Sequence, residues 1–210
     1  MTRNQRETNE LFDGWANTYD QDLAADPGGP LTGYAQSLTG AARLVRAGQG
    51  ERVLDIGVGT GAFAALLAAD GAEIWGVDPS AAMLERCKDA YPGFRLAPGA
   101  FGPLDFPAAT FDVVASSFAW HHVPPAERPA ALAEVRRVLR PGGRFCLLDI
   151  VFASAAAQAA ARDEIGSDWD DDEEYALVGD LDELLLTAGW RRTRWRQTGP
   201  YHWAVSAEPS

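Results

Sequence analysis

Val53-Leu54-Asp55-Ile56-Gly57-Val58-Gly59-Thr60-Gly61 is the stretch that decides how this 210-residue chain folds. Its apolar run, ending in an acidic residue, predicts a buried strand, and the Ala/Leu-rich sequence after Gly61 predicts a helix. Glycines at alternate positions allow a tight turn and let a ligand approach the main chain without a Cβ atom in the way. The free N–H groups and positive dipole end of the helix point at the ligand. Such a turn is typical of a site for an adenosyl cofactor.

Outward from this turn, apolar runs alternate with helical segments between residues 50 and 150, which indicates a parallel sheet. The expected strands are Arg52–Ile56, Glu73–Val77, Phe94–Ala97, Phe111–Ser117 and Arg144–Val151. The expected helices are Ala62–Asp70, Ala81–Ala90 and Ala126–Leu139, with Pro141-Gly142-Gly143 ending the last one. Two further strands, Trp190–Arg196 and Tyr201–Ala207, are joined by a hairpin at Gln197–Pro200. We therefore expect a parallel sheet with a terminal antiparallel strand, and a ligand above the strand carboxyl ends.

The regions outside this core suggest one domain overall, with a helical lid at residues 1–48 on a core at residues 49–210. In the lid segment, Phe12, Trp15 and Tyr19 have the spacing of one helix face. The run Asp168–Glu174 contains six acids in seven positions, which favours a solvated loop over a cation site. Asp180 is expected to cap the helix that follows.

Charge and composition limit the partners. The chain has 18 basic and 30 acidic residues, a net charge of −12, which disfavours nucleic acid and anionic membranes and favours a small molecule. Arg192, Arg194 and Arg196 alternate along one strand and keep an RNA acceptor open as an alternative. Cys87 and Cys146 match no metal or redox spacing. Without an apolar leader at the N-terminus or a run of membrane-spanning length, we expect a cytoplasmic protein.

The glycines alone do not choose between two adenosyl cofactors. Gly57-x-Gly59-x-x-Ala62 also satisfies the dinucleotide fingerprint, and Asp78 lies where a ribose-binding acid is expected, so an NAD-dependent oxidoreductase is one alternative. Asp55 favours S-adenosylmethionine (AdoMet), because a carboxylate beside a pyrophosphate is unfavourable, whereas AdoMet presents a sulfonium and an ammonium. A structural acid that caps the N–H groups of the turn is the other interpretation of Asp55.

Taken together, the motifs resemble those of the class I AdoMet-dependent methyltransferases. The glycine turn, Val77-Asp78-Pro79-Ser80 and Leu139-Arg140-Pro141-Gly142-Gly143 all match that family. The motifs Phe12-x-x-Trp15-Ala16-x-x-Tyr19-Asp20 and Phe118-Ala119-Trp120-His121-His122 are similar to those of the small methyltransferases of the YrrT type, over nearly the whole chain.

The resemblance implies a single-domain Rossmann-like α/β fold. Its sheet would have seven mostly parallel strands, one antiparallel strand from the C-terminal hairpin, and helices on both faces. It also implies AdoMet-dependent methyl transfer to a small molecule of unknown identity, with S-adenosylhomocysteine (AdoHcy) as the product. A non-catalytic AdoMet-binding module is a further alternative.

The resemblance also implies a set of cofactor contacts. The backbone of Gly57, Gly59 and Gly61 would lie along the methionine part of AdoMet. Asp78 would accept hydrogen bonds from both ribose hydroxyls, or else cap a helix that begins at Pro79. Pro79 and Met83 would border the adenine, although Met83 is equally typical of a packed core.

Two more positions complete the expected cofactor site. Ala100 stands where the family usually has an acid for the adenine amino group, so a backbone carbonyl or stacking on Phe101 would have to replace that contact. Ser116, near the end of the fourth strand, is expected to hydrogen-bond the cofactor or substrate, or to cap the next turn.

Three residues are the candidates for the methyl-acceptor side of the site. His121 and His122 offer a general base, because imidazole titrates near neutral pH. Adjacent residues point in different directions, so we expect only one of them to face the pocket. The pair supplies too few ligands for a zinc site, and no metal is expected. Tyr19 would close over the cofactor, unless it only packs the lid helix on the sheet.

Overall fold

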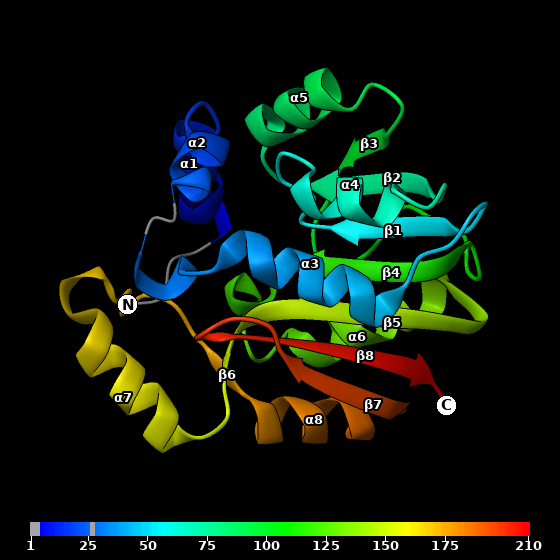
Figure 1. Ribbon diagram of the computed structural model, residues 1–210. Coiled ribbons are helices and arrows are strands. Elements are labelled where there is room, and N and C mark those ends of the chain that lie inside the picture. The colour runs from blue at the N-terminus through cyan, green and yellow to red at the C-terminus, as the bar shows by residue number, and fades with distance from the viewer. Residues whose placement is uncertain (1–4, 26–27) are drawn as a thin grey trace.

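The computed structural model describes residues 5–25 and 28–210, and its centre is an eight-stranded, mostly parallel sheet (Figure 1). The strand order is β3-β2-β1-β4-β5-β8-β7, with β6 paired to β5 off this path. The strands are β1 Arg52–Ile56, β2 Glu73–Asp78, β3 Arg95–Pro98, β4 Phe111–Ser117, β5 Leu139–Phe152, β6 Ala176–Leu177, β7 Trp190–Gln197 and β8 His202–Pro209. Strand β8 runs antiparallel to both of its neighbours, β5 and β7. This confirms the predicted fold class, with one strand more than expected.

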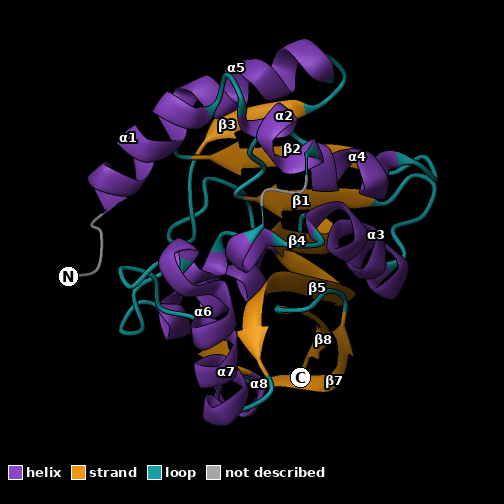
Figure 2. Cartoon of the chain, turned by 60° about the vertical axis from the view of Figure 1, so that its left-hand side comes forward, coloured by secondary structure: helices purple, strands orange, loops and turns teal. Residues whose placement is uncertain are grey.

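Helices cover both faces of the sheet (Figure 2). They are α1 Gln5–Trp15, α2 Tyr19–Ala24, α3 Tyr34–Val45, α4 Ala62–Ala68, α5 Ala81–Ala90, α6 Arg128–Val138, α7 Ala155–Ile165 and α8 Val178–Thr187, with single 3₁₀ turns η1 Gly29–Leu31, η2 Trp120–His122 and η3 Gly166–Asp168. Strand β1 shows why two layers form. Because side chains alternate along a strand, Leu54 and Ile56 pack in one core cluster with α6 and α8, whereas Val53 packs in the other with α3 and α4.

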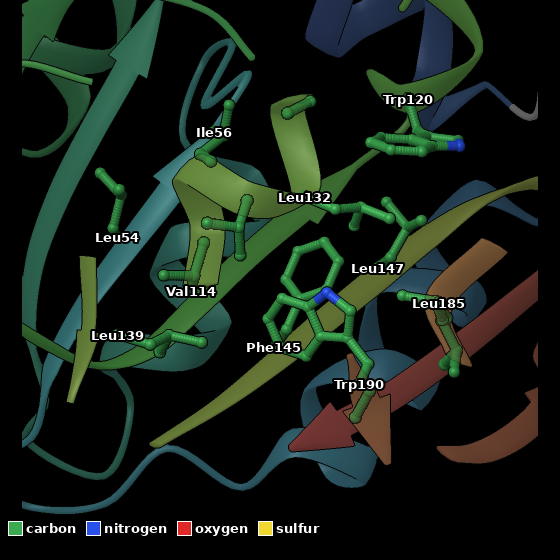
Figure 3. Close-up of a cluster of buried hydrophobic side chains, with 14 of the residues drawn as sticks. Leu54, Ile56, Val114, Trp120, Leu132, Leu139, Phe145, Leu147, Leu185 and Trp190 are labelled. Carbon is green, nitrogen blue, oxygen red and sulfur yellow. The ribbon is translucent and has the colours of Figure 1, made fainter. Parts of the chain in front are cut away.

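The cluster on the α6/α8 face ties the C-terminal hairpin to the parallel sheet (Figure 3). Phe145 on β5 is fully buried, and its ring centroid lies 5.4 Å from that of Trp190 at the start of β7. Leu132 and Leu147 are buried in the same cluster. The hairpin is therefore part of the common core.

Two local predictions about helix ends were wrong. Helix α6 ends at Val138 and Pro141–Gly143 lies inside β5, because the β4–β5 pairing already starts at Phe111 and Leu139 and shifts register afterwards. Helix α8 begins at Val178, so Asp180 lies in its first turn and is not its cap.

The arginine stripe is also interrupted. The β7–β8 register shifts between Arg191 and Arg194, where Arg192 has a φ of 53° and its Nη1 donates to Glu208 Oε2 over 2.9 Å. A bulge of this kind breaks the regular alternation that would align Arg192 with Arg194 and Arg196. Within the part of the chain that the structure describes, no helix combines the length and apolar character needed to cross a membrane.

Candidate active site

The glycine turn follows β1 and uses the conformational freedom of its glycines. Gly57, Gly59 and Gly61 have φ angles of 75°, 53° and 94°, in the region that other residues rarely adopt. A Cβ atom on Gly57 would lie 2.5 Å from that of Ala119, whereas one on Gly59 would meet no other atom within 4 Å. Gly57 is thus packed against Ala119 in the loop after β4, whereas the backbone of Gly59 borders open space in the cavity described below. Gly61 is the N-cap of α4, and its Cβ atom would lie 2.8 Å from Cys87 Sγ, which indicates a structural role.

Asp78, the last residue of β2, is bound to the turn. Its Oδ2 accepts the N–H of Gly59 at 2.8 Å, and its Oδ1 accepts the N–H of Ser80 at 2.9 Å. Burial raises the pKa of Asp78 to about 6, while these two hydrogen bonds oppose that rise. A carboxylate has about four lone-pair sites, so two bonded N–H groups leave room for further hydrogen bonds.

The cap of α5 is Ser80. Its Oγ accepts the N–H of Met83 at 3.1 Å, and its φ of −86° and ψ of 117° are typical of an N-cap. Pro79 therefore precedes the cap and does not occupy the first helical position. Asp78 is therefore not the N-cap of α5, which was the alternative interpretation of this residue.

A cavity of about 750 Å³, including space open to solvent, lies above the carboxyl ends of β1, β2 and β4. The predicted site residues that line it are Tyr19, Gly57, Gly59, Asp78, Pro79, Met83, Ala100, Phe101 and His122. Lining residues that the sequence did not single out for the site include Thr8, Val123, Pro124 and Glu127. The wall also includes Phe12 and the end of β4 with the motif that follows it, Ser117, Phe118 and Ala119.

Four predicted site residues, Asp55, Gly61, Ser116 and His121, do not line this cavity. Ser116 Oγ donates to the carbonyl of Ile56 at 2.7 Å and so ties β4 to β1, while its neighbour Ser117 lines the cavity. Asp55 is fully buried, and neither of its carboxylate oxygens has a hydrogen-bond partner among the described residues. Burial, reinforced by Asp78, holds the pKa of Asp55 well above its usual range. Asp55 does not line this cavity, so its expected charge contact with the cofactor stays a prediction.

The N-terminal helices are hydrogen-bonded to the cofactor loops. Asp13 Oδ1 accepts a hydrogen bond from Ser80 Oγ at 2.6 Å, and Asp20 Oδ1 accepts one from Thr60 Oγ1 at 2.6 Å. Arg86 on α5 adds a third attachment, because its Nη2 donates to the carbonyl of Asn17 at 2.9 Å. Figure 1 shows α1 and α2 on the side of the sheet where β1 and β2 end. These contacts fasten the lid segment over the cavity.

Tyr19 lies where the lid meets the cavity. Its ring contacts Trp15 edge-to-face with centroids 4.7 Å apart, and its hydroxyl is hydrogen-bonded to that of Tyr34. Burial raises the pKa of Tyr19 to about 12, although the bond to Tyr34 opposes that rise. The hydroxyl therefore keeps its proton at neutral pH and can donate it in a hydrogen bond, but it is not a base.

The two histidines have different surroundings. His121 Nδ1 lies 2.6 Å from Asp149 Oδ1, and burial of the imidazole opposes charge while Asp149 favours it, so that the pKa of His121 is raised. His122 Nδ1 lies 3.2 Å from Glu173 Oε2, and burial, followed by the neighbouring His121, lowers the pKa of His122. His122 lines the cavity and His121 does not, but both histidines line a second hollow beside it, so the expectation that only one faces the pocket stays a prediction.

Glu173 was not identified from the sequence. It belongs to the acidic run expected to be a solvated loop, yet its side chain is only 10% exposed. Nothing in a run of six acids distinguishes the one that folds inward, because its partner His122 lies about fifty residues away in the chain.

A metal ion is a second use of the same groups. Among the described residues, His121, His122 and Glu173 each bring one ligand atom to within 4.8 Å of the others. The sequence expectation of no metal therefore stays a prediction. The separation of 3.2 Å between His122 Nδ1 and Glu173 Oε2 is that of a direct hydrogen bond.

The cavity residues fit an adenosyl cofactor. Gly59 opens the main chain to the ligand, Asp78 retains lone pairs for two hydroxyls, and Met83 and Phe101 offer apolar surface to a base. Ala100 offers no side-chain acceptor to the adenine amino group. The loss of one hydrogen bond to a partly solvated group costs about 1 kcal/mol, which does not prevent binding.

Comparison with known proteins agrees with this fold and site. A family model described as a methyltransferase domain matches residues 53–143. An uncharacterized methyltransferase of Geobacillus kaustophilus is 30% identical to this chain, covering 96% of this chain and 97% of its own. The uncharacterized methyltransferase YrrT of Bacillus subtilis is also 30% identical, over 96% of this chain and 98% of its own.

A solved structure from Thermotoga maritima has the same fold. Its title describes a SAM-dependent methyltransferase, possible histamine N-methyltransferase, and the TM-score is 0.73 at 19% identity, over 96% of this chain and 99% of that one. The family model and the relatives define a methyltransferase, and the solved structure has the same Rossmann-like fold. Within that class, the chain belongs to the family of small methyltransferases that includes YrrT.

Proposed function

We propose that this methyltransferase transfers the methyl group of AdoMet to a small molecule that binds between Tyr19 and His122. One observation carries the proposal: the cofactor cavity shares Phe12, Tyr19, Phe118 and His122 with a second hollow. That hollow reaches the acidic segment and is lined by Trp15, Tyr175, Asp168, Asp170 and Glu173, among others. The glycine turn and Asp78 are absent from its wall, so the methyl acceptor would lie on this side of the shared residues.

The roles of the cofactor residues follow from their positions. The main chain at Gly57 and Gly59 borders the methionine part of AdoMet, and Asp78 accepts the ribose hydroxyls. Pro79, Met83, Ala100 and Phe101 border the adenine. Gly61, Ser116 and Asp55 support this arrangement from positions outside the cavity wall.

The protein contributes mainly position and the exclusion of water. When bound, AdoMet supplies an activated methyl group on a sulfonium. The enzyme must then hold a nucleophile in line with the S–CH₃ bond, and alignment of this kind lowers barriers by about 7–11 kcal/mol in favourable systems. Residues 1–48 act as the lid on the core at residues 49–210, although residues 1–4 and 26–27 lie outside the described part. Tyr19 donates a hydrogen bond at the acceptor site, and one histidine of the pair accepts a proton there.

The first test is binding followed by turnover. Calorimetry with AdoMet and AdoHcy at concentrations up to millimolar should show a single site. AdoHcy release should then be measured with separate panels of small amines, small phenols and transfer RNA. We expect turnover with small molecules and none with RNA, because the net charge is −12. Methylation of RNA alone would contradict the proposed acceptor class.

A further inference from the structure

The two adjacent histidines are held at Nδ1 by two different carboxylates, and the second nitrogen of His122 is buried without a hydrogen-bond partner in the described residues. Asp149 binds His121 at Nδ1 and also accepts the N–H groups of Trp120 and His121 at 2.8 and 3.1 Å and that of Ile150 at 2.7 Å. The side chain of Asp149 is 1% exposed, so the ring of His121 is fixed from inside the fold. This histidine positions the start of the loop after β4.

His122 is free at its other nitrogen. Its Nδ1 faces Glu173, whereas its Nε2 is buried and has no hydrogen-bond partner in the described residues. The ring of Phe12 meets it edge-to-face at a centroid distance of 5.4 Å. A buried polar atom without a partner is unusual in a folded protein, and His122 itself lines a ligand cavity, so a partner for Nε2 is expected from that side.

The position of His122 relates that nitrogen to the reaction. His122 lines both the cofactor cavity and the second hollow, whereas His121 and Glu173 line only the second. A carboxylate on one side of an imidazole and a ligand cavity on the other is the arrangement of a general base oriented by an acid. The carboxylate of Glu173 accepts a hydrogen bond from Nδ1–H of His122, which fixes the tautomer in which Nε2 can accept a proton.

We propose that Glu173 is a positioning residue that holds His122 as its Nδ1–H tautomer, so that His122 Nε2 takes the proton of the methyl acceptor. This inference rests on the proposed function. A lone pair of the acceptor atom forms the new bond to the methyl carbon, and the C–S bond breaks with its electrons on sulfur, which leaves neutral AdoHcy. The acceptor's proton passes to Nε2 and from there to solvent.

The inference narrows the acceptor class. A base is of use only if the attacking atom carries a proton, as in an amine, a hydroxyl or a phenol. Carboxylates, which attack without losing a proton, gain nothing from His122. The acceptor is therefore expected to be an N–H or O–H compound.

The charged groups around His122 determine the effect of a change at Glu173. Burial and His121 lower the pKa of His122, while Glu173 and Asp149 raise it. Arg128 opposes charge on the adjacent His121. Removing the charge of Glu173 therefore lowers the pKa of His122 further and removes its tautomer preference.

A metal ion held by His121, His122 and Glu173 is the competing interpretation. Ligand atoms around a tetrahedral zinc ion stand roughly 3.3 Å apart, given metal–ligand bonds of about 2 Å. The two separations from Glu173 Oε2 are 3.2 Å to His122 Nδ1 and 3.9 Å to His121 Nε2. These distances are compatible with a metal ion and with a hydrogen bond. A metal would bind Nδ1 of His122 in place of its proton, so the two interpretations predict different ¹⁵N NMR spectra.

The experiment is ¹⁵N NMR of the full-length protein labelled at histidine. The chain has only three histidines, so variants at His122 and His202 assign every signal. At pH 7 we expect His122 to be neutral, protonated at Nδ1 and bare at Nε2. Glu173→Gln should lower its pKa by about half a unit or more and mix the two tautomers. Glu174→Gln is the matched control, because it makes the same chemical change at an exposed neighbour and should leave the signals unchanged.

Two additions separate the alternatives. AdoHcy should shift the Nε2 signal of His122 more than either signal of His202. Failure to bind AdoHcy would contradict the proposed function, whereas an Nε2–H tautomer at His122 would overturn the inference alone. Addition of equimolar Zn²⁺ tests the metal. If the signals of both His121 and His122 shifted as on direct coordination, and Glu173→Gln abolished these shifts, the cluster would be a metal site and the inference would be overturned.

The proton transfer itself is read from AdoHcy release with the amine and phenol panels. Glu173→Gln should lower kcat about tenfold or more while the KM for AdoMet stays unchanged, and Glu174→Gln should match the wild type. Equal rates in the two variants, or no turnover of either panel by a protein that binds AdoHcy, would show that His122 does not act as the base.

Discussion

Among single residues, Asp78 combines two opposing requirements. Its burial favours the protonated form and raises its pKa to about 6, whereas recognition of two ribose hydroxyls requires an ionised acceptor. The N–H groups of Gly59 and Ser80 reduce the conflict by stabilising the carboxylate. The sequence placed an acid here, but the pKa depends on burial by the lid, which no local pattern reveals.

The first prediction concerns the pH dependence of cofactor binding. Because only ionised Asp78 accepts both hydroxyls, AdoHcy should bind about tenfold more weakly at pH 5 than at pH 8, with the change centred near pH 6. Asp78→Asn should bind weakly at both values. Calorimetry at the two pH values measures this, and His122→Gln serves as a control that should keep the dependence. Undiminished binding by Asp78→Asn would refute the ribose assignment.

A second prediction contrasts two glycines of the turn. Gly57→Ala should destabilise the fold by more than about 2 kcal/mol, because its Cβ atom would clash with Ala119 at a positive φ. Gly59→Ala should cost about 1–2 kcal/mol but reduce AdoHcy affinity tenfold or more, because the new methyl group enters the cavity. Thermal unfolding and calorimetry distinguish the two effects.

The control for this pair is Gly93→Ala, at an exposed site with no atom within 4 Å and no positive φ. It should change neither stability nor binding. If Gly59→Ala bound AdoHcy as well as the wild type, the ligand could not lie against this backbone.

At the scale of elements, the lid is joined to the core by polar contacts at its rim. Asp13 and Asp20 are exposed, yet each accepts a short hydrogen bond from a loop that borders the cofactor cavity. The aromatic spacing of α1 and α2 suggested a packed helix face, and Phe12 and Tyr19 do line the cavity. The contacts of Asp13 with Ser80 and of Asp20 with Thr60 span 67 and 40 residues, so they could not be predicted from local spacing.

The third prediction tests this attachment. The double variant Asp13→Ala and Asp20→Ala should release AdoHcy about tenfold faster and become sensitive to limited proteolysis in the lid, since two hydrogen bonds to charged groups are lost. The melting temperature should fall by only a few degrees, because the core is unchanged. Stopped-flow displacement measures the release rate. Glu10→Ala, on the exposed side of α1, is the control, and a double variant with wild-type release would show that these bonds do not hold the lid.

At the scale of the whole molecule, the sheet is continuous from β3 to β7. The sequence predicted the bounds of some of its strands but not of others. The bounds of β1 and β4 were predicted correctly, because both strands are apolar runs buried on the two faces of the sheet. Strand β6 has two residues and forms only where the chain returns to β5, so no sequence period marks it. The start of β5 contains a Pro-Gly-Gly sequence that is typical of a turn, and tertiary pairing with β4 overrides it.

In the candidate site, too, residues in local motifs could be predicted from the sequence, whereas residues brought together by long-range contacts could not. Gly59 and Asp78, which lie within one βα unit, were predicted from local motifs and do line the cavity, while their cofactor contacts stay predictions. Glu173 was missed, because its contact with His122 arises only when the segment after β5 packs against the loop after β4. Long-range pairs of this kind have no signature in a single sequence.

The fourth prediction concerns the common core. Phe145→Ala should destabilise the protein by about 3–5 kcal/mol, because it leaves a cavity between β5 and the C-terminal hairpin beside Trp190. Denaturant unfolding measures the loss, and AdoHcy affinity under native conditions should not change, because Phe145 does not line the cofactor cavity. Leu186→Ala, at a side chain that is 55% exposed, should be nearly neutral. Equal stability of the two variants would show that the hairpin folds independently of this contact.

The polar attachment of the lid also bears on the order of events in turnover. Helices α1 and α2 are hydrogen-bonded to loops of the proposed cofactor cavity, and we expect these bonds to break before AdoMet exchanges. The second hollow shares Tyr19 and His122 with that cavity and includes residues of the acidic segment but none of the glycine turn. We therefore expect an ordered mechanism, in which AdoMet enters first, the acceptor enters and its methylated form leaves, and AdoHcy departs last. An enzyme of this kind is sensitive to accumulation of its own by-product, so its rate would depend on how quickly other enzymes remove AdoHcy.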